Sequence, residues 1–80
     1  MAHPTELLTP KDLEILEEWG RRVRREKANW EFINSLPNNF RKALEYYIET
    51  GDIRTASVKF NINIYLLNEL RIKAGIPSTI

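Results

Sequence analysis

Apolar residues recur at intervals of three and four through most of the chain, and no segment alternates like a β-strand. One such stretch runs from Pro10 to about Ser35 and ends before Pro37, and Gly20 is a point where it can bend or break. Further helices are expected over about 38–50, 53–60 and 64–74. The pattern predicts an all-α single domain over residues 1–80. A long helix occupies about 10–35, and a helix-turn-helix unit occupies about 38–77.

The first helix carries a heptad-like apolar stripe. Leu16, Val23 and Trp30 are seven residues apart, and Trp19 and Ile33 lie on the interleaved positions. Two interpretations are open. The stripe packs on its own domain, or these five residues form the seam of a homodimer, which the two tryptophans favour.

Composition narrows the function. The 80 residues include 12 basic and 11 acidic side chains, no cysteine and a single histidine, His3. We therefore expect no metal site, no cofactor, no small-molecule substrate and no catalytic residues. The chain has no apolar run of membrane-span length, and its N-terminus lacks a secretory signal pattern, so a cytoplasmic protein without membrane contact is expected.

Charge is segregated along the chain, and the segment "RRVRREK" (21–27) holds five bases and one acid. Its arginines are expected on the side of the helix away from the apolar stripe. Glu17–Arg21 and Glu18–Arg22 have the spacing of helical ion pairs. The segment is either a solvated, ion-paired face or an accessory contact to nucleic acid.

The stretch "TASVKFNINIYLLNEL" (55–70) meets the requirements of a sharp turn between two helices. The small residues Ala56 and Ser57 allow close helix contact. Asn61 tolerates positive φ, Ile62 is placed to plug the core, and Asn63 can cap the next helix. The second helix is expected to bury Leu66, Leu67, Leu70 and Ala74.

From Ile53 to Pro77, "IRTASVKFNINIYLLNELRIKAGIP" resembles the helix-turn-helix domains of small prokaryotic regulators, and the preceding "ALEYYIETGDI" resembles their support helix. The stretch over about 40–77 is similar to short antitoxin-like proteins of archaea and bacteria. Asn61 stands where Gly is usual and Ser57 where Ala is usual, and residues 1–36 have no counterpart. The resemblance implies a transcriptional regulator that binds double-stranded DNA as a homodimer.

In such domains the second helix enters the major groove. Tyr65 and Asn68 would then meet base edges, and Asn63 would present the helix N-terminus to a phosphate. The basic residues placed to contact the phosphate backbone are Arg54, Lys59, Arg71 and Lys73.

The hairpin also has a different interpretation. Ile64 and Ile72 are apolar residues on the expected groove face, and Glu69 would repel phosphate. Ile64, Ile72 and Tyr65 would then form an apolar patch for a protein partner, and the alternative function is a protein–protein adaptor. A structural or RNA-associated helical module is the third.

Overall fold

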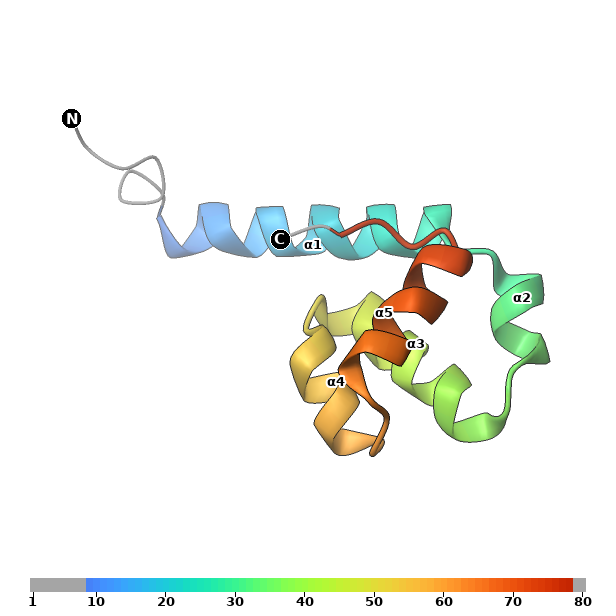
Figure 1. Ribbon diagram of the computed structural model, residues 1–80. Helices are drawn as coiled ribbons and strands as arrows, with labels where there is room; N and C mark the ends of the chain where they lie inside the picture. The colour runs from blue at the N-terminus through green and yellow to red at the C-terminus, as the bar shows by residue number, and fades with distance from the viewer. Residues whose placement is uncertain (1–8, 79–80) are drawn as a thin grey trace.

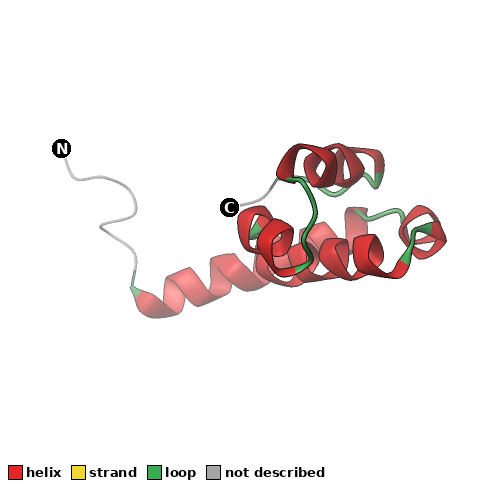
Figure 2. Ribbon diagram, turned by 60° about the horizontal axis from the view of Figure 1, so that its bottom comes forward, coloured by secondary structure: helices red, strands yellow, loops and turns green. Residues whose placement is uncertain are grey.

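The computed structural model describes residues 9–78, and within them the chain forms five α-helices and no strand (Figures 1 and 2). The predicted all-α class is confirmed. The molecule is elongated, 45 × 24 × 18 Å, because the first helix projects beyond the cluster formed by the other four (Figure 1). His3 and the expected features of the N-terminus lie outside the described residues.

Helix α1 (Pro10–Lys27) begins with a capping box, in which Thr9 and Asp12 each accept a hydrogen bond from the other's backbone N–H. The Thr9 N–H and the Thr9 hydroxyl both donate to the Asp12 carboxylate, and these two hydrogen bonds hold the pKa of Asp12 below its usual value. The helix runs through Gly20 without a break, and Gly20 is buried.

The single helix expected over about 10–35 is wrong, because the chain leaves the helical conformation at Ala28. Helix α2 (Trp30–Ser35) starts again at Asn29, whose side chain accepts from the Phe32 N–H. The Asn29 N–H donates instead to the Ala74 carbonyl at 2.7 Å, which ties the break to the end of the last helix. Asparagine is a preferred cap residue, so the signal for this break was present in the sequence.

Helix α3 (Asn38–Thr50) is central to the fold and packs against all four other helices. Pro37 occupies its cap position, and no side chain caps the start of the helix. Gly51 ends it with a φ of +70°, which glycine adopts without strain. The completely buried large side chains of the domain are Ile33, Leu44, Ile48, Leu67 and Ile76.

Helix α4 (Ile53–Lys59) and helix α5 (Ile64–Lys73) form the C-terminal hairpin and pack on α3. Leu67 and Ala74 are buried as expected, and Leu70 is partly buried against the core. Leu66 is 46% exposed, so its predicted place in the buried stripe is wrong. None of the helices in the described part of the chain is long and apolar enough to cross a lipid bilayer.

Candidate nucleic-acid interface

The turn between α4 and α5 has the geometry that its residues predict. Asn61 has a φ of +52°, and Ile62 is 6% exposed with its side chain in the core. The Asn63 side chain accepts hydrogen bonds from the Tyr65 and Leu66 N–H groups and so caps α5. A positive φ at one residue reverses the chain without a glycine, because asparagine tolerates this conformation better than other side chains.

Two contacts hold α5 against α4. Ala56 is completely buried on α4. The Ser57 hydroxyl donates to the Ile62 carbonyl, and its carbonyl accepts from the Ile62 N–H at 2.9 Å. Since both bonds reach the residue that plugs the core, the angle between the helices is fixed at the turn itself.

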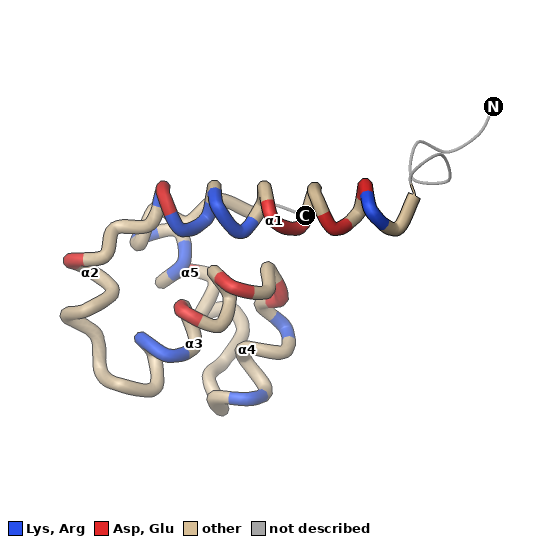
Figure 3. Tube along the Cα trace, turned by 180° about the vertical axis from the view of Figure 1, so that it is seen from behind, with Lys and Arg blue, Asp and Glu red and all other residues tan. Residues whose placement is uncertain are grey.

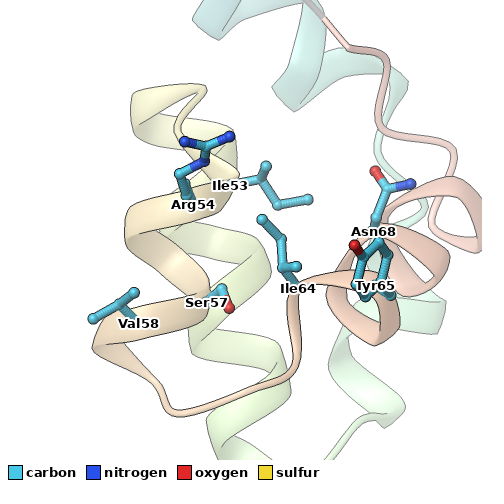
Figure 4. Close-up of a pocket in the computed structure, with 7 residues that line it drawn as sticks. All are labelled: Ile53, Arg54, Ser57, Val58, Ile64, Tyr65 and Asn68. Atoms are coloured by element: carbon cyan, nitrogen blue, oxygen red, sulfur yellow. The ribbon is translucent and has the colours of Figure 1, made fainter.

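A groove of about 600 Å³ lies between the two helices on their outer side (Figure 4). Its wall is mainly apolar, with Arg54 and Asn68 as polar groups on opposite sides. The residues that line it are Ile53, Arg54, Ser57, Val58, Ile64, Tyr65 and Asn68.

Large side chains near the groove are open to solvent. Tyr65 is 80% exposed, Val58 is 79% exposed and Ile72 is 58% exposed. Tyr65 and Asn68 come from successive turns of α5 (Figure 4). The exposed surface of the hairpin thus combines two groups capable of hydrogen bonding with several apolar ones.

Asn68 and Arg71 form a small network at the far end of α5. The Arg71 Nε donates to the Asn68 Oδ1 at 3.0 Å, and its Nη1 donates to the Ile76 carbonyl at 2.8 Å. Arg71 is therefore half-buried and held by the C-terminal segment, which differs from the phosphate contact expected of it. The same bond fixes the amide plane of Asn68.

The other basic residues expected to contact phosphates lie around the hairpin. Arg54 and Lys73 are exposed, on α4 and α5 respectively. Lys59 is exposed but lies over the Tyr46 ring, with Nζ 5.0 Å from its centroid. Three of the four expected phosphate contacts are therefore open to solvent, and Arg71 is the exception.

Asp52 caps α4 by accepting hydrogen bonds from the Thr55 N–H at 3.0 Å and its hydroxyl at 2.6 Å. These bonds lower the pKa of Asp52 below its usual value. In the described residues no group of three His, Cys, Asp or Glu side chains is arranged to hold a metal ion.

The five residues expected at a dimer seam differ in how far they are exposed to solvent. Leu16 and Trp19 are exposed on α1, and Val23 is half-buried. Trp30 is 38% exposed, and its Nε1 donates to the Arg25 carbonyl at 3.0 Å. Ile33 is completely buried in the core and has no surface left for a partner.

The arginines of "RRVRREK" were expected to be solvated or to contact nucleic acid, and three of them instead fasten α1 to the end of α3. The Arg24 Nε donates to the Ile48 carbonyl at 2.8 Å, and the Arg21 Nε donates to the Glu49 carbonyl at 2.9 Å. Arg25 pairs with the Glu49 carboxylate. The expected ion pairs of Arg21 and Arg22 with acids one turn earlier are not formed among the described residues, where Arg21 pairs with Glu49.

Arg24 is only 3% exposed, and its guanidinium lies 5.9 Å from the centre of the Tyr47 ring. Burial lowers its pKa, although an arginine still keeps its charge. Cations at a helix C-terminus offset the partial negative charge there, and α3 has no basic residue in its own last turn. The absence of a basic residue from the last turn of α3 is thus a sequence feature that indicates a cation supplied by another helix.

No protein-family model matches the chain, and no curated protein or solved structure is significantly similar to it.

Proposed function

We propose that the α4–α5 hairpin is a helix-turn-helix unit that binds double-stranded DNA, and that the protein is a small transcriptional regulator of the antitoxin-like kind. The observation that carries the proposal is the turn: positive φ at Asn61, the buried Ile62 and the cap at Asn63. Together they direct the first turns of α5 outward, with backbone N–H groups and the positive end of the helix dipole at its start.

Asn68 is the candidate for base recognition. Its Oδ1 already accepts from Arg71 but has a second lone pair, and its Nδ2 carries two donors. An asparagine amide with this capacity pairs with adenine through N6 and N7 in the major groove. Arg71 acts here as a positioning residue, because its bond holds the amide plane before DNA arrives.

Tyr65 lies one turn before Asn68, and its exposed ring and hydroxyl suit a base edge or a phosphate. Arg54 and Lys73 flank these residues on α4 and α5 and are exposed enough to meet the phosphate backbone. Such contacts fix position without selecting sequence.

The second candidate function is a protein-docking adaptor, and the apolar groove favours it. Val58, Ile64 and Tyr65 would receive an apolar side chain or helix there. The two functions differ in which substitutions matter: those of Arg54 and Lys73 for DNA, and those of Val58 and Ile64 for a protein partner.

The test is selection of duplexes from a random library at low salt, followed by binding measurements over a salt series. Asn68→Ala should weaken binding to the selected duplex by roughly 1–3 kcal/mol and leave binding to random duplex nearly unchanged. Arg54→Ala or Lys73→Ala should weaken both and lower the salt slope by about one unit.

Lys11→Ala is the matched control, since it removes an exposed basic side chain from the start of α1, outside the hairpin. It should leave the slope unchanged. Failure of the wild type to bind any duplex at low salt would overturn the DNA proposal in favour of the adaptor. Equal effects of Lys11→Ala and Arg54→Ala would show that the charge contact is unspecific.

A further inference from the structure

Tyr65 is the most exposed of the large apolar side chains on α5, and it lies on the same side of the helix as Asn68 (Figure 4). It is 80% exposed, and it belongs to the wall of the apolar groove between α4 and α5. Residues three apart on a helix are separated by about 4.5 Å along the axis and by about 60° around it. A molecule that reaches the Asn68 amide from outside therefore also meets the ring of Tyr65.

The side chains that line the groove are ordered from a cation to an amide. From the α4 side to the α5 side they run Arg54, then Ile53 and Ile64, then Tyr65 and Asn68 (Figure 4). None of the acidic residues in the described part of the chain lines the groove, and α4 carries two basic residues and no acid (Figure 3). The surface therefore suits an occupant that is negatively charged on the α4 side, apolar in the middle and able to form hydrogen bonds on the α5 side.

The major groove of DNA presents these groups in the same order at an A·T pair. Going inward from the phosphates of its own strand, thymine presents its C5-methyl group and then its O4, and the paired adenine presents N6 and N7 beyond them. A G·C pair has no methyl group at the corresponding place. The order of cation, apolar wall and amide thus matches an A·T pair.

We propose that the ring of Tyr65, backed by the apolar wall of the groove, contacts the C5-methyl group of a thymine at or next to the adenine that Asn68 reads. This contact rests on the proposed DNA binding and deepens it, because it assigns a base to Tyr65. Successive base pairs are about 3.4 Å apart along the duplex. The separation of about 4.5 Å between Tyr65 and Asn68 brings them to the same base pair or to neighbouring ones.

The contribution of one methyl group can be measured separately from every other contact. Deoxyuridine lacks the C5-methyl group of thymidine and pairs with adenine in the same way. The transfer of one methyl group from water to an apolar contact changes a binding constant about fourfold. A protein partner in the groove has no thymine, so sensitivity to this replacement separates the two occupants.

The experiment uses the duplex selected from the random library, with each thymine replaced singly by deoxyuridine. The affinity of the wild type should fall about fourfold at a thymine at or beside the adenine read by Asn68, and it should stay the same at thymines elsewhere. That adenine is the one whose replacement no longer matters in Asn68→Ala.

Variants at Tyr65 assign the methyl contact to the ring. Tyr65→Ala should bind the thymine and uracil duplexes equally, whereas Tyr65→Phe, the matched control, keeps the ring and should keep the fourfold ratio. Leu66→Ala removes a half-exposed side chain of α5 that does not line the groove, and it should also keep the ratio. Because each ratio compares two duplexes with the same protein, a loss of folded protein does not change it.

A wild type that binds no duplex would contradict the proposed DNA binding, and the methyl contact would fall with it. Specific binding that deoxyuridine leaves unchanged at every position would overturn the methyl contact alone. A selected duplex without thymine at or beside that adenine, or a ratio that survives in Tyr65→Ala, would do the same. Equal losses on both duplexes with Tyr65→Phe would assign the hydroxyl to a phosphate and overturn the ring contact.

Discussion

Helix α1 and the inner side of the α4–α5 hairpin differ in how far their apolar residues are buried. In the hairpin Ala56 on α4 and Ile62 at the turn are buried, whereas on α1 Leu16 is 46% exposed and Trp19 is 56% exposed. The side of α1 that meets the domain contains Arg24, which is buried over Tyr47. Periodicity identifies which residues share a face of a helix. It does not identify whether that face is covered by the same chain.

The difference has a physical cause at the end of α3. Its last carbonyls need donors, and the guanidinium groups of Arg21 and Arg24 supply them across the contact with α1. Hydrogen bonds from the arginines of α1 thus orient that helix on α3. The side of α1 that bears Leu16 and Trp19 is then left exposed to solvent.

The largest expected effect is a difference in stability between variants at two positions of the same predicted apolar stripe. Ile33→Ala should lower the free energy of unfolding by roughly 2–5 kcal/mol, because a completely buried side chain is removed from the core. Trp19→Ala should change it by no more than about 0.5 kcal/mol in dilute solution. Urea unfolding at concentrations where the chain is monomeric checks both, and a large loss with Trp19→Ala would place Trp19 inside the domain.

Arg24→Ala is expected to lower the free energy of unfolding by roughly 2–3 kcal/mol, since the Ile48 carbonyl loses a charged donor and α1 loses its anchor. Gly51→Ala sharpens the test. Its Cβ would lie 3.0 Å from the Arg24 Nη1, and φ there is +70°. In a double-mutant cycle, Gly51→Ala should cost less in the Arg24→Ala background, and strictly additive losses would contradict the packing described here.

Substitutions at Asn61 are predicted to change stability only through the backbone conformation that the turn requires. Asn61→Gly should be neutral or slightly stabilising, and Asn61→Val should cost roughly 1–2 kcal/mol because a β-branched residue resists positive φ. Thermal unfolding of the two variants side by side measures the difference. Equal stabilities would mean that the turn is not held at Asn61.

The smallest effect is the pH dependence contributed by Asp52. Its pKa is lowered in the folded chain, so its stabilising contribution is complete above the unfolded pKa of 3.8 and disappears as the pH falls through the lower folded value. Asp52→Asn keeps a capping oxygen but cannot titrate. Its stability should therefore fall less between pH 5 and pH 2 than that of the wild type, as followed by circular dichroism.

Much of the C-terminal half could be predicted because its signals are local. Asn61 and Asn63 specify a turn and a helix cap through their own backbone and side chain, and the structure has both at the expected place. The placement of α1 could not be predicted in this way. Its position depends on unsatisfied carbonyls more than twenty residues away, and on a break at Asn29 that is secured by the Ala74 carbonyl.

The candidate site was predictable in part for the same reason. The exposure of Tyr65 follows from the helix register after the Asn63 cap, whereas the half-buried position of Arg71 depends on the returning C-terminal segment.

The central claim is that the outer surface of the α4–α5 hairpin binds DNA. Backbone amide chemical shifts measured during titration with the selected duplex test it most directly. DNA should shift the signals of residues 61–72 and leave those of the first turns of α1 nearly unchanged. Shifts caused by DNA that concentrate on α1, or that spread evenly over the chain, would contradict the account.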